Sequence, residues 1–259
     1  MSLPRLHVVE VAERDYARVL TLQRSLVERV AEGSEPPTLL LVEHDAVVTI
    51  GRGNQRLGDV APPLFVPGPD ALRGRPLVPV ERGGGVTVHG PGQLVVYPIV
   101  RLVDHDVRAL LRALEGGLVT GLARMGIAAE TREGATGIWV AGPPVGQTSD
   151  GDASAWRGAS SDSSAGSPDA LFGAAAARKI ASLGVAVRRF TTLHGLALNV
   201  SIDVASFAGT DPCGYDAGVM TSCELELCRP VSMAEARAAV VPAVVEALER
   251  RLAEAQGRA

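Results

Sequence analysis

Two residues in this chain have the types and settings that covalent chemistry needs. Cys213 lies between proline and glycine in DPCGYD, which predicts a sharp, exposed turn. A free thiol titrates near ~8.5, so a nucleophilic Cys213 needs a nearby cation that stabilises its thiolate. Lys179 is the only lysine among 25 Lys and Arg residues. Because a partly desolvated lysine can release and regain a proton whereas arginine cannot, we interpret Lys179 as a candidate proton shuttle.

A glycine-rich stretch, RGGGVTVHGPGQ at 82–93, is the second candidate for function. Successive glycines let a ligand approach the main chain closely, so the stretch could form one wall of a binding site. It lacks the Gly-Lys-Ser/Thr of a phosphate-binding loop and the Gly-x-Gly-x-x-Gly of a dinucleotide site. The alternative is a wide turn between strands, with His89 as an ordinary hydrogen-bonded histidine.

The remaining cysteines and histidines do not predict a metal site. Cys223 and Cys228 lie in TSCELELC, whose alternation is strand-like, and we interpret both as packing residues. An odd set of three cysteines is unlike a disulfide framework, and the five histidines are scattered. We therefore expect reduced thiols, no metal and no cofactor.

Charge and hydropathy limit the kinds of partner that the chain can bind. The net charge of -4 argues against general nucleic-acid binding. A local basic face could still form and would suit an acidic protein; its candidates are Arg52, Arg56, Arg73, Arg75, Arg82, Arg188 and Arg189. No apolar run approaches the roughly 20 residues that span a bilayer, and the first residues lack a secretory signal. We expect a cytoplasmic protein that binds no membrane.

Hydrophobic periodicity predicts an α+β fold, a mixed α/β sandwich with a mostly antiparallel mixed sheet flanked by helices. The predicted helices span 15–31, 106–125 and 232–255. The predicted strands are a hairpin of 38–43 with 46–51, strand-like runs at 76–81, 94–100 and 136–141, and paired strands at 179–190 and 191–202. Ser, Gly, Asp and Ala dominate 142–170, which predicts a flexible insertion in a single domain of 1–259.

Four ordered motifs carry a family resemblance. They are LLLVEHDAVVTIGR, RGGGVTVHGPGQLVVYP, KIASLGVAVRRFTTLHGLALNV, and PCG followed by VMTS. With the first predicted helix they cover most of 12–256. The chain thereby resembles the lipoyl(octanoyl) transferases of the biotin and lipoate attachment-enzyme superfamily. It departs from them at 142–170, where family members pass quickly from the strand to the lysine.

The resemblance implies a reaction and its partners. An octanoyl group would pass from octanoyl-acyl carrier protein to a lysine on lipoyl domains of 2-oxoacid dehydrogenase complexes and on the glycine cleavage H protein. Cys213 would hold the octanoyl group as a thioester, and Lys179 would lower the pKa of that thiol and shuttle protons. The implied acyl pocket comprises Arg82, Gly83, Gly84, Gly85, Val86, Thr87, Val88, His89, Ser182, Leu183, Gly184, Gly195, Leu196 and Ala197.

Three other functions fit some of these residues. An ATP-dependent lipoate or biotin-type ligase of the same superfamily would not need Cys213. A cysteine acyl hydrolase would use Cys213 with His89 or His194 and deliver the acyl group to water. A scaffold would bind acyl carriers without turnover.

Overall fold

The computed structural model of the chain describes residues 5–55, 67–141, 177–210 and 217–257. Cys213 and the predicted insertion at 142–170 lie outside these residues. In the described parts, no helix is both long enough and apolar enough to cross a membrane.

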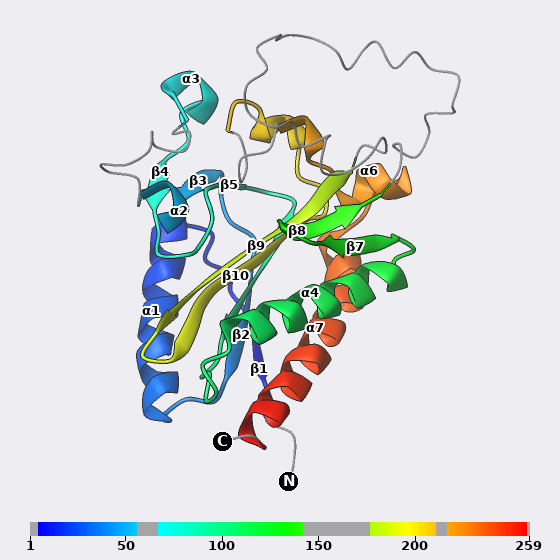
Figure 1. Cartoon of the computed structure of the whole chain (residues 1–259). Helices are drawn as coiled ribbons and strands as arrows, with labels where there is room; N and C mark the ends of the chain where they lie inside the picture. Colours follow the sequence, from blue (N-terminus) through cyan, green and yellow to red (C-terminus); the bar gives the residue numbers. More distant parts are fainter. Residues whose placement is uncertain (1–4, 56–66, 142–176, 211–216, 258–259) are drawn as a thin grey trace.

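A seven-stranded mixed sheet forms the centre of the fold (Figure 1). Its strands in spatial order are β1 (His7–Glu10), β2 (Thr38–Val42), β6 (Gln93–Ile99), β10 (Thr191–Asn199), β9 (Arg178–Arg188), β8 (Ala135–Val140) and β7 (Ala129–Arg132). The β1–β2 pair is parallel, and the other pairs of this sheet are antiparallel. The predicted pairing of β9 with β10 is confirmed. β2, β6 and β10 are buried along their whole length because helices cover both faces of the sheet.

A second sheet of three strands contains β4 (Leu77–Pro79), β3 (Val47–Ile50) and β5 (Val86–His89), in that order. The predicted hairpin of 38–43 with 46–51 is therefore wrong, because β2 and β3 belong to different sheets. β5 lies inside the glycine-rich stretch, where the sequence suggested a wall or a turn and no ordinary strand.

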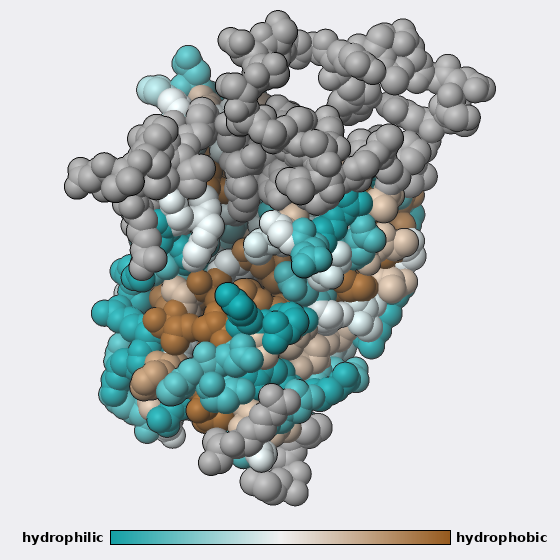
Figure 2. Space-filling view, in the orientation of Figure 1, coloured by the Kyte–Doolittle hydropathy of each residue, from teal (hydrophilic) through white to brown (hydrophobic). Residues whose placement is uncertain are grey.

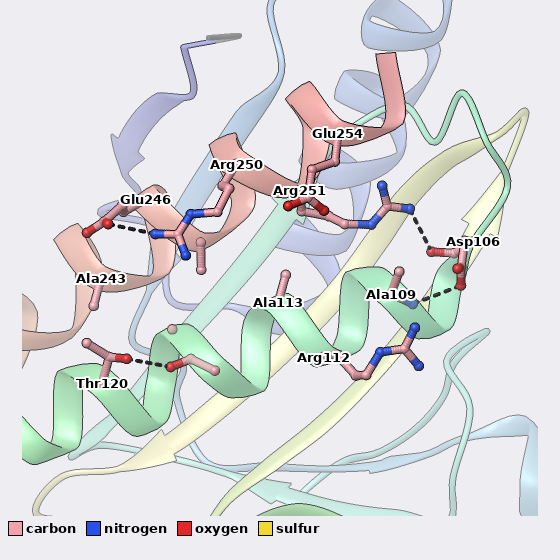
Figure 3. A pocket seen from close by; sticks show the side chains of 13 residues that line it. Asp106, Ala109, Arg112, Ala113, Thr120, Ala243, Glu246, Arg250, Arg251 and Glu254 are labelled. Carbon is pink, nitrogen blue, oxygen red and sulfur yellow. Dashed lines mark hydrogen bonds and ion pairs between the residues drawn. The ribbon is translucent and has the colours of Figure 1, made fainter. Parts of the chain in front are cut away.

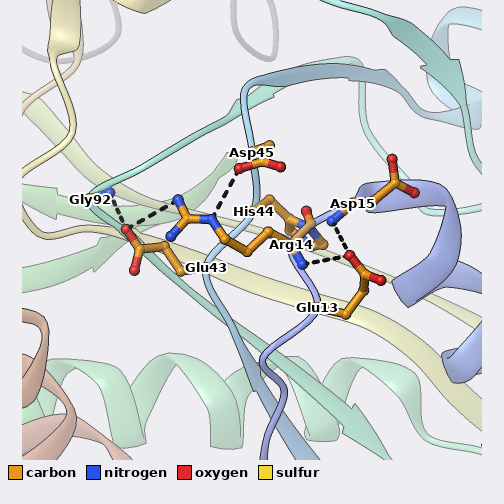
Figure 4. A network of polar contacts seen from close by, with 7 residues as sticks. All are labelled: Glu13, Arg14, Asp15, Glu43, His44, Asp45 and Gly92. Atoms are coloured by element: carbon orange, nitrogen blue, oxygen red, sulfur yellow. Dashed lines mark hydrogen bonds and ion pairs between the residues drawn. The ribbon is translucent and has the colours of Figure 1, made fainter.

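The segment between β2 and β3 explains why these two strands belong to different sheets. His44 donates from Nδ1 to the carbonyl of Arg14 (3.0 Å), and its Nε2 lies 2.8 Å from the Tyr97 hydroxyl. On either side of His44, Asp45 and Glu43 pair with Arg14, and Glu43 also accepts a hydrogen bond from the Gly92 amide (Figure 4). These contacts turn the chain away from β2, so a tight hairpin cannot close.

Three long helices flank the large sheet. α1 (Tyr16–Glu32) covers one face, and α4 (Val107–Arg124) and α7 (Met233–Gln256) cover the other (Figure 1). Asp15, Asp106 and Ser232 cap their first turns through side-chain oxygens, as the sequence pattern requires. α7 continues through Pro242. The mixed α/β architecture with helix-flanked mixed sheets confirms the predicted fold class.

Short elements complete the chain. They are α2 (Arg52–Gln55), α3 (Pro69–Leu72), the 3₁₀ turns η2 (Val204–Phe207) and η4 (Ala217–Val219), and α6 (Cys223–Leu227). The strand-like interpretation of TSCELELC is wrong, because Ser222 caps a helical turn there. Cys223 is buried in the main core and Cys228 is exposed, which agrees with packing roles.

The surface over the sheet is partly apolar. On the face in Figure 2, hydrophobic residues gather between the hydrophilic residues of the flanking helices. Val187 and Phe190, at the turn end of the β9–β10 hairpin, are 41% and 53% exposed.

Two glycines set the distance between α4 and α7. A Cβ on Gly121 would lie 2.6 Å from the Cα of Val240, and a Cβ on Gly117 would lie 2.8 Å from the Cα of Val244. The glycines that weaken α4 by helix propensity therefore let its backbone pack directly against α7.

Replacing Gly121 by alanine is expected to lower the free energy of unfolding by about 1–3 kcal/mol, because the new methyl group collides with the α7 backbone. Gly116→Ala is the matched control on the same helix, since nothing lies within 4 Å of its Cβ position. That control should raise stability by up to about 1 kcal/mol through helix propensity. Urea unfolding of both variants measures this, and equal effects would refute the packing role of Gly121.

Candidate active site

A groove with a volume of about 520 Å³ runs between α4 and α7 (Figure 3). None of the residues that the sequence predicts for the site lines it. Its charged groups include Arg251, which pairs with Asp104, and Arg250, which pairs with Glu246. The Arg251 pair joins α7 to the segment before α4, and the Arg250 pair lies on the surface of α7. We therefore assign no chemistry to this groove.

The second cavity brings the sequence motifs together. Segments far apart in the chain contribute its lining: Tyr16, Arg82, Thr87, His89, Val95, Tyr97, Ser182, Leu183, Gly184, His194, Gly195, Leu196 and Ala197. It therefore collects most of the predicted acyl pocket. Val86 and Val88 instead pack into an apolar cluster with the small sheet. Gly83, Gly84 and Gly85 are not among the residues that line the cavity. The volume is about 20 Å³, room for one water, so a longer ligand requires the lining to move apart.

Arg82 organises the glycine-rich segment. Its side chain is buried, and its Nη1 donates to the carbonyls of Gly83 (3.1 Å) and Gly85 (2.9 Å). Its Nη2 donates to the carbonyl and hydroxyl oxygens of Thr49 on β3. A buried guanidinium requires such acceptors, so the loop must fold around Arg82. Arg82 is thus an internal residue and no part of an exposed basic face.

Glycines permit the close contact between this segment and the large sheet. A Cβ on Gly184 would lie 3.2 Å from the Gly83 carbonyl oxygen, and the Gly83 amide donates to the Val185 carbonyl. Opposite Gly184 in the sheet, Gly195 would place a Cβ 2.1 Å from the Val96 carbonyl oxygen. The predicted glycines therefore act by excluding side chains where backbones meet.

Hydrogen bonds of the Gln93 and Asn199 side-chain amides fix the tautomer of His89. The Gln93 side-chain nitrogen donates to the Val88 carbonyl and to Oδ1 of Asn199, so its Oε1 faces His89 and accepts from Nδ1 at 2.7 Å. Burial lowers the pKa of His89 to about 3, with the neighbouring His44 as a further cause. His89 is thus a neutral imidazole with its proton on Nδ1, which leaves Nε2 able to accept a proton or hydrogen bond.

Aromatic rings pack around His89. The rings of Tyr16, His44 and His89 form a triangle: the Tyr16 centroid lies 5.0 Å from His44 and 5.8 Å from His89, and the two histidine centroids are 5.8 Å apart. Burial raises the pKa of Tyr16 to about 12 and that of Tyr97 well above its usual value. Both phenols therefore stay protonated and can donate hydrogen bonds.

Lys179 is wholly buried on β9, at 0% exposure. Its Nζ lies 5.4 Å from the centroid of the Trp139 ring. Gly137, at φ 123°, makes room for the side chain, because a Cβ there would lie 2.5 Å from Cε of Lys179. The lysine side chain therefore occupies a slot that the neighbouring strand β8 leaves open.

The chain that follows Cys213 returns to β9 at this lysine. The Thr221 amide donates to the Lys179 carbonyl, and Met220 forms a parallel bridge with Lys179. A buried ion pair fixes the contact: Arg178 donates from Nε and Nη2 to Glu226, which also accepts from the Thr221 hydroxyl at 2.6 Å. These bonds hold the pKa of the Glu226 carboxyl below its usual value against the effect of burial. The segment 220–226 is thus locked to the strand that carries Lys179.

Sequence reasoning missed Tyr16 and Tyr97 and considered His194 only for a hydrolase. Tyrosine is rare in this chain, with three residues in all. Two of the three line the cavity, and a search for scarce residue types would have found them. His194 adopts a left-handed conformation with φ 61°, which a single sequence does not reveal.

The mixed α/β fold is similar to that of lipoate–protein ligases. The structure of a bi-partite lipoate protein ligase with its E2 lipoyl domain from Thermoplasma acidophilum aligns over 99% of this chain and 92% of that one, with a TM-score of 0.60 at 18% identity. Lipoate-protein ligase A bound with ATP aligns over 99% and 94%, with a TM-score of 0.57 at 17% identity.

Residues 15–245 match the lipoyl protein ligase A/B catalytic domain, and the chain belongs to that family. An octanoyltransferase of Mycobacterium leprae is 40% identical over 256 residues, 97% of this chain and 92% of that protein. An octanoyltransferase of Mycobacterium tuberculosis is 36% identical over 250 residues, 96% and 89% of the two chains. The chain is an acyltransferase, and its relatives place it among the octanoyltransferases of protein lipoylation.

The buried histidines predict how stability depends on pH. Burial lowers the pKa of His44, of His89 to about 3 and of His194 to about 4. In the unfolded chain they titrate near 6.5, so between that value and the lowered pKa the unfolded state binds more protons. The free energy of unfolding should therefore fall as the pH falls, by up to about 2 kcal/mol at pH 5 for each strongly shifted histidine.

Urea unfolding at pH 7.5 and pH 5 measures this loss. Carboxylates with a lowered pKa, such as Glu226, titrate below this window and do not contribute to it. Equal stability at both pH values would contradict the neutral, buried state of the histidines.

Proposed function

We propose that this chain transfers an octanoyl group from octanoyl-acyl carrier protein to a lysine of lipoyl domains, through a thioester on Cys213. The names of its relatives support the octanoyl group, and the E2 lipoyl domain solved with one structural neighbour supports the acceptor. The observation that carries the proposal is the wholly buried Lys179 on the strand that lines the cavity, with Met220 and Thr221, which follow Cys213 in the sequence, paired to it.

The transfer divides into two acyl exchanges. The Cys213 thiolate attacks the donor carbonyl, the carrier thiolate leaves, and it takes a proton from the Lys179 ammonium. The acceptor amine then attacks the enzyme thioester, the Cys213 thiolate leaves, and the now neutral Lys179 takes the proton that the amine loses. Lysine and thiol end as they began, so no cofactor is consumed.

Docking of acidic carriers requires exposed cations. Of the candidate arginines in the described chain, Arg52, Arg73, Arg188 and Arg189 are exposed. Arg189 pairs with Glu28 and Glu32, and Arg75 donates to the Ser206 carbonyl. We assign the docking role to the first three.

Intact-protein mass spectrometry tests the acyl-enzyme. After incubation with octanoyl-acyl carrier protein and no acceptor, the wild type should gain one octanoyl group that hydroxylamine removes, and Cys213→Ala should gain none. This result would also exclude an ATP-dependent ligase, which forms no acyl cysteine. An unmodified wild type that still octanoylates an added lipoyl domain would overturn the covalent step. Adding the lipoyl domain to acylated enzyme then separates transfer from hydrolysis.

Lys179→Arg tests the proton shuttle. Arginine keeps the positive charge but cannot release its proton, so transfer to the lipoyl domain should fall by roughly 10²–10⁴-fold. Lys179→Met removes the charge with little change in length and should lose as much. Thermal unfolding of both variants checks that they fold. Near wild-type transfer by Lys179→Arg would show that charge alone is needed.

A further inference from the structure

We propose that His194 and Glu81 form the far wall of the acyl slot and limit the length of the acyl chain that the enzyme transfers. The inference rests on the proposed function, since it takes the reacting carbonyl to lie near Lys179. It assigns a specificity role to His194, which lines the cavity, and to Glu81, which lies against the His194 ring.

The strand register gives the slot its direction. Ser182, Leu183 and Gly184 of β9 pair with Ala197, Leu196 and Gly195 of β10, and all six line the cavity. Lys179 lies beyond one end of this block, and His194 with its partner Val185 lies at the other. Six residues of strand separate Lys179 from Val185, or about 20 Å. An extended eight-carbon thioester with its cysteine side chain is roughly 13 Å long, so its methyl end reaches His194 when the carbonyl lies several Å from the Lys179 Cα, within reach of the lysine side chain.

His194 closes the distal end. Its side chain is 1% exposed and lines the cavity, and its backbone amide donates to Oε1 of Gln23 on α1. Within the described residues, Nδ1 of His194 has no hydrogen-bond partner, and Nε2 faces Glu81. Burial lowers its pKa to about 4, so the imidazole is neutral at neutral pH. A buried ring nitrogen without a hydrogen bond is costly, and its place at the end of a ligand slot suggests a functional reason.

Glu81 joins this ring to the surface. Its Oε2 lies 3.4 Å from Nε2 of His194, and its Oε1 accepts from Arg24 at 2.7 Å. The Arg24 side chain is 45% exposed, so solvent begins directly behind this pair. A longer acyl chain must therefore push its last carbons against a carboxylate and an imidazole, which is sterically and electrostatically unfavourable.

Truncating the wall should lengthen the slot. His194→Gly suits the test because glycine adopts φ 61° without strain. The matched control is Phe190→Gly: Phe190 is aromatic, has φ 58° and belongs to the same hairpin, but it is exposed. Glu81→Ala is a second variant, which opens the same end from the half-buried side.

The experiment compares kcat/KM for octanoyl, decanoyl and dodecanoyl carrier protein, with a lipoyl domain as acceptor. In His194→Gly or Glu81→Ala, the ratio of kcat/KM for decanoyl to that for octanoyl carrier protein should rise at least about tenfold over wild type, because each additional buried methylene stabilises binding. Phe190→Gly should leave the ratio unchanged. If the wild type transfers octanoyl and both wall variants keep the wild-type decanoyl-to-octanoyl ratio, the inference is overturned. Absence of octanoyl transfer by the wild type would instead overturn the proposed function.

Discussion

The cavity depends on the burial of one guanidinium group. Arg82 satisfies its donors with carbonyls of the glycine-rich segment and with Thr49 of the small sheet. The same segment lies against β9 at Gly184, where a Cβ would lie 3.2 Å from the Gly83 carbonyl oxygen and 3.3 Å from Cδ of Arg82. Because an unsatisfied buried cation is very costly, the loop, the small sheet and the large sheet are held in one arrangement. The narrow space that they enclose follows from this arrangement.

The polar side chains that line that space are uncharged at neutral pH, apart from Arg82. Burial keeps His89 and His194 neutral and Tyr16 protonated. Such polar groups can orient a carbonyl or a thioester through hydrogen bonds. The one lysine of the chain lies beside this space, wholly buried on β9. Polar groups at the ends and a glycine-lined middle suit a ligand with one reactive end and a hydrocarbon tail.

Local signals in the sequence predicted much of the fold. The Asp15 cap with its apolar periodicity gave α1 within one residue, and uninterrupted apolar runs gave the paired central strands. The predicted hairpin was wrong because His44 bonds to Tyr97, 53 residues away, and single-sequence patterns do not encode such a contact. The short helix after Ser222 was missed because alternation over a few residues fits a strand equally well. Motif residues identified most of the cavity, whereas Tyr16 joins it only through the packing of α1.

A crystal structure of the acylated enzyme tests the central claim most directly. After reaction with octanoyl-acyl carrier protein, electron density for the acyl chain should run along β9 and β10, past Gly184 and Gly195. The carbonyl should lie near Nζ of Lys179 and the terminal methyl toward His194. The glycine-rich segment should keep its bonds to Arg82 while the lining moves apart. An acyl chain in the groove between α4 and α7, or one directed away from His194, would contradict this account.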